Sequence, residues 1–176
     1  MELYHHGIKG QKWGVRRYQN KDGTLTEAGK KRSNLDDVNT VFKSLSGKDK
    51  YMMGFDENDK IMYSKKDPST YENLGKAFIK KVNDKPVAFL TIDKAQNGYA
   101  QIAVATDPRH RGKGYSSELV KRGQEWIEKY GNGEYKGLEW WAYNDNAASN
   151  ATAKKNGFKK VKTKWDNEFS YYRKDL

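Results

Sequence analysis

One stretch, residues 98–131, joins a strand pattern, a basic glycine-containing loop and a helix pattern. The apolar run at 98–106 predicts a strand whose end is buried on both faces. The loop "DPRHRGKG" follows at once, and the apolar spacing after it predicts an amphipathic helix over 116–131. A strand that leads through such a loop into a helix directs backbone N–H groups and the positive end of the helix dipole into one concavity. The letters alone fit a charged loop before a helix, but this order of elements predicts a diphosphate site.

The residue types in the loop agree with that prediction. Gly112 and Gly114 permit backbone conformations closed to other residues and let a ligand approach the backbone closely. Arg109, Arg111 and Lys113 attract an anion over a longer range. The spacing is R-x-x-G-x-G, which is neither a Walker loop nor the G-x-G-x-x-G dinucleotide fingerprint.

Further elements are predicted on both sides of this stretch, and their order predicts one domain over residues 34–176 with a mixed sheet. They are a helix at 35–46, a short hairpin at 50–66, two strands around an Asn83-Asp84 turn within 75–93, a strand at 137–143, a helix from 146 stopped at Asn156-Gly157, and a strand pair within 158–174.

Residues 1–33 show no helical or strand period and are rich in basic side chains. We expect an extended arm that becomes ordered on a partner, with a flexible tail as the alternative. His5 and His6 have no carboxylate or cysteine at ligand spacing, so no metal site is predicted.

The net charge of +11 indicates acidic partners, although a lysine-rich solvated surface explains it equally well. The absence of cysteine excludes disulfides, thiolate catalysis and cysteine metal sites. No apolar run reaches the roughly 20 residues of a membrane span, and the start lacks the apolar core of a secretory signal. We therefore expect a cytoplasmic protein with no membrane partner.

Two motifs in this order resemble the GNAT superfamily of N-acetyltransferases. "PRHRGKGYSSELV" is similar to the R/Q-x-x-G-x-G/A motif, with Arg109, Gly112 and Gly114 at its three positions. "NAASNATAKKNGFKKV", from Asn146, resembles the later signature in which a helix ends in Gly-Phe before the next strand. The resemblance covers about residues 37–173. It implies an α/β (α+β mixed) fold with a central, mostly antiparallel sheet that has a splayed strand pair and is flanked by helices.

The resemblance implies acetyl-CoA as co-substrate and a primary amine, on a protein or small molecule, that attacks the thioester directly in a ternary complex. Asn146 would bond the pantetheine arm or cap its helix, two compatible roles. His110 is also weighed as a base, although we expect it to point to solvent. The implied acetyl-CoA residues are Val104, Ala105 and Thr106 for the pantetheine arm, Arg109, His110, Arg111, Gly112, Lys113, Gly114, Tyr115 and Ser116 around the diphosphate, and Asn146.

The groups that usually transfer protons in this family are missing. The glutamate base would fall at Ala100 or Gln101, and the tyrosine acid at Ala153. None of these side chains can do that work.

Glu139 and Tyr143 are the nearest replacements, because they lie on one face of the strand at 137–143. Glu139 would activate a water, and Tyr143 would donate a proton to the departing thiolate. The alternative is that Glu139 faces solvent while Trp140 and Trp141 belong to the core.

The resemblance places the acceptor pocket roughly at residues 35–70 and 163–170. Asp56, Glu57 and Asp59 either select a cationic amine or are simply solvated. The arm at 1–33 resembles a short element of phage and prophage head-region proteins of Gram-positive bacteria. That likeness implies a phage or prophage origin in a bacterial host. A second hypothesis is therefore a binding protein that keeps the fold and acts through this arm on nucleic acid or a virion structural protein.

Overall fold

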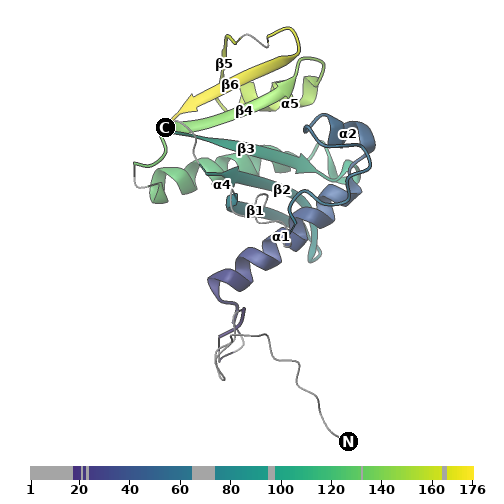
Figure 1. Ribbon diagram of the computed structural model, residues 1–176, viewed down its shortest axis with the longest axis vertical. Helices are drawn as coiled ribbons and strands as arrows, with labels where there is room; N and C mark the ends of the chain where they lie inside the picture. The colour runs from purple at the N-terminus through teal and green to yellow at the C-terminus, as the bar shows by residue number, and fades with distance from the viewer. Residues whose placement is uncertain are drawn as a thin grey trace, which may run out of the picture.

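The computed structural model describes residues 18–20, 22, 24–64, 74–94, 98–131, 133–163 and 166–176. The described strands form one six-stranded sheet in the order β1-β2-β3-β4-β6-β5. The elements are α1 (Glu27–Ser44), α2 (Gly47–Tyr51), β1 (Leu74–Val82), β2 (Lys85–Asp93), β3 (Tyr99–Thr106), the 3-10 helix η1 (Pro108–His110), α4 (Tyr115–Tyr130), β4 (Gly137–Tyr143), α5 (Ala147–Lys155), β5 (Lys159–Val161) and β6 (Phe169–Asp175), arranged as Figure 1 shows.

The sheet is mixed, because β3 and β4 run parallel while the other neighbouring strands run antiparallel. Helices cover both of its faces (Figure 1). The predicted fold class is therefore confirmed, as are the strands and helices expected after residue 75. None of the helices in the described ranges is long and apolar enough to cross a membrane.

Side chains of β2 alternate between two hydrophobic clusters, one on each face of the sheet. Phe89 packs among the apolar residues of α1, whereas Leu90 and Ile92 pack with those of α4. All three are fully buried. Burial of both faces explains the continuous apolar run of β2 and fixes its register between β1 and β3.

The turn between β1 and β2 is the predicted one. Asn83 and Asp84 have φ angles of 48° and 59°. Two consecutive positive φ angles give the tight turn whose twist suits a hairpin, and Asn and Asp tolerate this region better than other non-glycine residues.

Helix α1 begins eight residues before the expected start at 35. Thr26 caps it by accepting a hydrogen bond from the Gly29 N–H at 3.1 Å. The expected limit of the arm at residue 33 therefore falls inside α1. Residues 1–17, which hold most of that arm, lie outside the described residues, so its binding role and its phage likeness stay predictions.

The hairpin predicted at 50–66 is wrong over the described residues 50–64, which hold the end of α2 followed by turns. Ser46 and Asp49 form a capping box that starts α2. Buried Asn39 of α1 then donates to the Tyr63 carbonyl at 2.8 Å and accepts from the Met62 N–H at 2.9 Å. A side chain from α1 thus replaces the strand partner that a hairpin would need.

Candidate active site

The two parallel strands at the centre of the sheet separate part of the way along. β3 pairs with β4 only from Tyr99 to Gln101, and the last paired residues are Gln101 and Glu139. Beyond that point β3 still pairs with β2, while β4 pairs with β6 along its whole length. One edge of β3 at residues 102–106 is therefore left without a strand partner in the described sheet.

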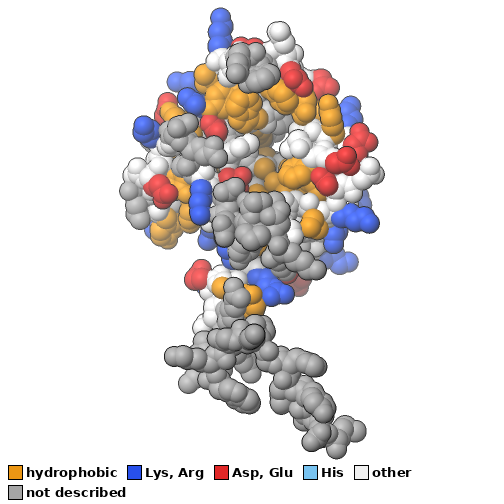
Figure 2. Space-filling model, viewed as in Figure 1, with side chains coloured by type: hydrophobic (Ala, Val, Ile, Leu, Met, Phe, Trp, Pro, Cys, Tyr) orange, Lys and Arg blue, Asp and Glu red, His pale blue; other side chains and the backbone are white. Residues whose placement is uncertain are grey.

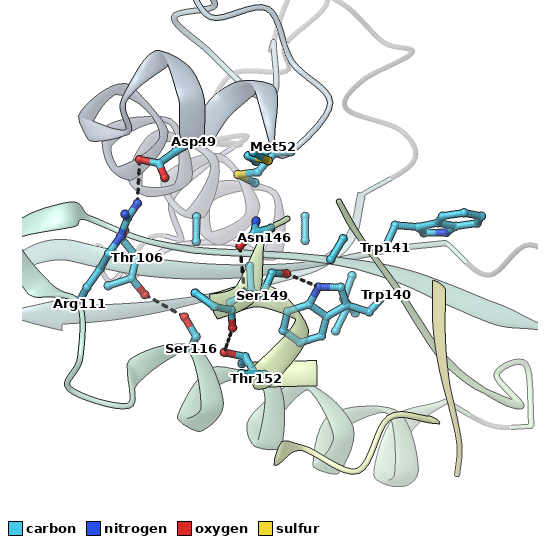
Figure 3. A pocket seen from close by; sticks show the side chains of 18 of the residues that line it. Asp49, Met52, Thr106, Arg111, Ser116, Trp140, Trp141, Asn146, Ser149 and Thr152 are labelled. Carbon is cyan, nitrogen blue, oxygen red and sulfur yellow. Dashed lines mark hydrogen bonds and ion pairs between the residues drawn. The ribbon is translucent and has the colours of Figure 1, made fainter. Parts of the chain in front are cut away.

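A cavity of about 830 Å³ occupies this gap. Its walls come from β3, the loop after it, the start of α4, β4, α5, and residues 52–54 after α2. Figure 3 shows Arg111, Thr106 and Ser116 toward one end, Asn146, Ser149 and Thr152 between, and Trp141 toward the other end. The end of β3 is consequently half-buried against the cavity at Val104 and Thr106, rather than buried on both faces as predicted.

The loop at residues 110–114 forms one end of the cavity and leads directly into α4. Gly112 and Gly114 have φ angles of 75° and 80°, which favour glycine, and a Cβ atom at either position would meet open space. Gly114 is the N-cap of α4 and offers no side chain to cap the helix. The first backbone N–H groups of α4 accordingly have no acceptor within the helix and no side-chain cap. Consecutive free N–H groups at a helix N-terminus favour an anion.

Asp107 closes the turn before this loop. Its carboxylate accepts from the Arg109 N–H at 2.9 Å and from the Arg109 guanidinium at 2.6 and 3.0 Å. These bonds outweigh the effect of burial and hold the pKa of Asp107 well below its usual range. The Arg109 side chain therefore holds the turn and does not line the cavity, although it was predicted to bind the diphosphate.

Arg111 instead connects the loop to α2. Its guanidinium makes a 2.8 Å ion pair with Asp49 (Figure 3). Burial raises the pKa of Asp49, but hydrogen bonds from Ser46 and Arg111 outweigh it and lower this pKa overall. At the base of the loop, the hydroxyls of Thr106 and Ser116 lie 3.0 Å apart and share a hydrogen bond.

His110 lines the cavity, against the expectation that it points to solvent. Its Nδ1 is shielded from solvent and has no hydrogen-bond partner in the described part of the chain. A shielded nitrogen without a partner costs free energy. The other predicted loop residues that line the cavity are Arg111, Gly112, Lys113, Gly114, Tyr115 and Ser116, together with Val104, Ala105 and Thr106 of β3.

A hydrogen bond joins helix α5 to β4 beside the cavity. Asn146 caps α5 by accepting from the Ser149 N–H at 3.1 Å, and it also lines the cavity (Figure 3). Trp140 is buried and donates from Nε1 to the Ser149 hydroxyl at 3.0 Å. Ala153, on the same helix, is fully buried and cannot serve as an acid.

The two predicted proton-transfer residues have different surroundings. Tyr143 lines the cavity, and partial burial together with the neighbouring Tyr51 raises the pKa of its phenol. Glu139 does not line the cavity. Its carboxylate accepts a hydrogen bond from Tyr171 and lies 3.9 Å from the Arg173 guanidinium.

Some cavity residues were not singled out from the sequence. Lys155 ends α5 at the wall of the cavity, and Glu168 and Phe169 reach it from the start of β6. Met52 and Met53 line it from the segment after α2. Their ranges lay partly within the expected acceptor region, but no local motif marks these residues. Asp56, Glu57 and Asp59, which were considered for the acceptor, do not line the cavity.

Comparisons with solved structures agree with this architecture. The GNAT domain of S. lividans PAT has a TM-score of 0.65 at 12% identity, over 82% of this chain and 86% of that one. A GNAT-family acetyltransferase from Streptococcus pneumoniae has a TM-score of 0.64 at 14% identity, over 83% of this chain and 95% of that one. At such identities the likeness shows the fold alone.

A Bacillus anthracis protein assigned to the acetyltransferases was solved with acetyl coenzyme A. It has a TM-score of 0.51 at 20% identity, over 60% of this chain and 66% of that one. The chain thus spans just under two thirds of that protein. No curated protein matches the chain in sequence. The model of the Acetyltransferase (GNAT) family, however, matches residues 45–158, which is more than half of the chain. The chain therefore belongs to the GNAT family of acetyltransferases.

Proposed function

We propose that the protein is an N-acetyltransferase that transfers the acetyl group of acetyl-CoA to a primary amine. The observation that carries the proposal is the splay of β3 from β4 beyond Gln101 and Glu139, with an anion-binding loop at one end of the resulting cavity. The acceptor amine, on a small molecule or a protein, would enter from the other end.

The residues present fit acetyl-CoA. The free edge of β3 at 102–106 offers backbone N–H and C=O groups to the amides of a pantetheine arm. The N–H groups of 111–117 and the basic side chains of the loop suit a diphosphate. Asn146 caps α5 through its side-chain oxygen, and its amide NH₂ donates no hydrogen bond to another described residue.

Bound acetyl-CoA supplies an activated acyl group, so that a C–N bond to the amine forms as the C–S bond of the thioester breaks. The protein would mainly hold donor and acceptor together, which lowers the barrier through proximity. Tyr143 is the candidate acid for the departing thiolate, because it lines the cavity and its phenol carries a proton at neutral pH. Glu139 would accept a proton only through a water, since it does not line the cavity.

Thermal unfolding with and without acetyl-CoA tests the proposal. A ligand that binds only the folded state stabilises it by about 2.7 kcal/mol at 100 times its Kd. We expect a rise in Tm with acetyl-CoA and a smaller one with dephospho-CoA, followed by release of free CoA thiol when an accepted amine is added. An unchanged Tm at millimolar acetyl-CoA would contradict the proposal.

A further inference from the structure

Charge is unevenly distributed in the wall of the cavity. The described cations in its wall are Arg111 and Lys113 of the loop and Lys155 of α5, with His110 beside them. The described carboxylates in the wall are Asp49 and Glu168, and Asp49 is paired with Arg111. Glu168 is exposed and makes no ion pair with a described residue. The loop side of the cavity is therefore basic, whereas Glu168 adds a negative charge to the wall that no described cation neutralises.

Aromatic rings form a continuous strip that runs from the end of α2 across β4 to β6, next to Glu168. Tyr51 stacks on Tyr143 at 5.4 Å between ring centroids, Tyr143 contacts Phe169 at 4.3 Å, and Phe169 meets the edge of Trp141 at 6.5 Å. The Trp141 ring in turn contacts the Tyr171 ring, with 4.2 Å between the centroids. Figure 2 shows hydrophobic side chains gathered over the β4 and β6 part of this face, beside a hollow. Partly exposed aromatic side chains that lie together beside a cavity favour a binding site for an apolar group.

The strip is only partly covered by the chain itself. Tyr51 is 50% exposed and Trp141 is 36% exposed. Arg173 occupies the far end by lying 5.0 Å from the Tyr171 ring. No described lysine or arginine lies over the rings of Tyr51, Trp141, Tyr143 or Phe169. The faces of these rings are negative and attract a cation.

Glu168 stands beside the strip rather than apart from it. It precedes Phe169 directly and lines the cavity, and its backbone carbonyl accepts from the Asn144 N–H at 3.0 Å. After burial and Tyr51, the charges of Glu168 and Asp145 also contribute to the raised pKa of Tyr143. Two carboxylates thus act on the same ring of the strip.

We infer that the acceptor is a cationic amine on an apolar or aromatic body, held over the rings of Trp141, Tyr143 and Phe169 and attracted by Glu168. This inference deepens the proposed function and rests on it. An acceptor that carries its own carboxylate near the amine would face Glu168 and be repelled. Specificity would therefore come from the charge of the acceptor as well as from the shape of its apolar part.

Three unreactive probes test the charge preference on protein saturated with CoA. They are benzyltrimethylammonium, benzyl alcohol and benzoate, which share a ring and differ in charge. Titration calorimetry at fixed ionic strength should give the order cation, neutral, anion, with roughly tenfold or more between cation and anion. Equal affinities, a preference for benzoate, or no binding of any probe would overturn the inference.

Matched variants locate the effect. Trp141→Leu should lower the affinity for the cationic probe about 3- to 10-fold. Trp141→Phe should keep most of that affinity, because only phenylalanine retains a ring face. Glu168→Gln should lower the affinity for the cationic probe and raise the affinity for the anionic probe. Glu128→Gln removes an exposed carboxylate of α4 outside the cavity and should change neither. If Trp141→Leu does not fold, the comparison of Glu168→Gln with Glu128→Gln still decides, and equal effects of these two would overturn the inference.

The same samples separate this inference from the proposed function. If acetyl-CoA stabilises the protein but the probes show no charge preference, the acetyltransferase proposal stands and the inference of a cationic acceptor on an apolar body is wrong. A missing response to acetyl-CoA would remove the proposed function itself. Acetylation of phenethylamine and of phenylalanine, which differ by one carboxylate, gives an independent readout: phenethylamine should have the higher kcat/KM, and Glu168→Gln should narrow the gap.

Discussion

Asp107 shows how one buried carboxylate fixes the start of the glycine-containing loop that lines the cavity. It is only 4% exposed, and both of its oxygens accept hydrogen bonds from Arg109. The pair turns the chain out of β3 through η1, so that the glycines after it reach the cavity. The sequence suggests an arginine that binds ligand, and the structure adds that its guanidinium is bonded to Asp107 two residues earlier.

Asp107→Asn is expected to destabilise the protein in a pH-dependent way. The pKa of Asp107 is depressed in the folded state, so its stabilising contribution is fully present above the unfolded pKa of 3.8, begins to fall below that pH, and is lost completely only below the depressed folded pKa. We expect a loss of about 1–3 kcal/mol in the free energy of unfolding at pH 7 and a smaller loss near pH 3, where the unfolded carboxyl is already protonated.

Urea unfolding at both pH values measures this difference, with Glu128→Gln as the control for loss of an exposed carboxylate. A loss that is equal at pH 7 and pH 3 would show that the charge of Asp107 is not what holds the turn.

Tyr143→Phe separates the two roles given to Tyr143, because it keeps the ring and removes the hydroxyl. If the phenol protonates the departing thiolate, kcat should fall by about 10²-fold while the KM for acetyl-CoA stays unchanged. Steady-state kinetics that follow CoA thiol release provide the measurement. An unchanged kcat would assign Tyr143 to acceptor binding alone.

At the scale of elements, local patterns predicted most of the fold. The hairpin turn at Asn83 and Asp84, the apolar stripe of α4 and the run of β4 each depend on neighbours in sequence, and the structure confirms them. The hairpin predicted at 50–66 was wrong for the opposite reason. The hydrogen bonds at Met62 and Tyr63 come from Asn39, a residue more than 20 positions away, and no periodicity can report such a partner.

The candidate site divides in the same way. The loop with Gly112 and Gly114 carries its own signal, because glycine spacing and the next helix are local features. Glu168 and Lys155 reach the cavity only through the pairing of β6 with β4 and the packing of α5 beside β4. Their roles therefore depend on tertiary structure, and a sequence of many exposed lysines and glutamates gives no reason to prefer these two.

The loop can be tested as an element by comparing equivalent glycines. Gly114 and Gly133 have φ angles of 80° and 74°, and a Cβ atom would meet open space at both. Alanine at either position should cost roughly 1–2 kcal/mol of stability through backbone strain. Only Gly114 lines the cavity.

Gly114→Ala should therefore also lower the affinity for acetyl-CoA by about tenfold. The added methyl group and the resulting shift of the α4 N-terminus would both lie where the ligand approaches. Calorimetric titration of Gly114→Ala and Gly133→Ala with acetyl-CoA provides the comparison. Equal affinities in the two variants would show that the loop backbone does not contact the ligand.

At the scale of the whole molecule, the net charge of +11 attracts any anion, including acetyl-CoA. That general field reaches only about 8 Å at physiological ionic strength. Lysines beyond this distance affect binding in dilute buffer, whereas lysines in the cavity wall also affect it at 0.15 M salt. The position of a lysine relative to the cavity, rather than the total charge, should then decide its contribution.

Lys154 and Lys155 allow a direct test, because they are neighbours in the last turn of α5 and both are exposed. Only Lys155 lines the cavity. Lys155→Gln and Lys154→Gln remove the same charge, so both should lower the affinity for acetyl-CoA slightly at low salt. At 0.15 M salt we expect Lys155→Gln alone to weaken binding, by about 3- to 10-fold, because screening removes the more distant charge first. Titrations at 0.02 and 0.15 M salt measure both affinities. If the two variants stay equal at 0.15 M salt, Lys155 contributes to the general field and does not contact the ligand.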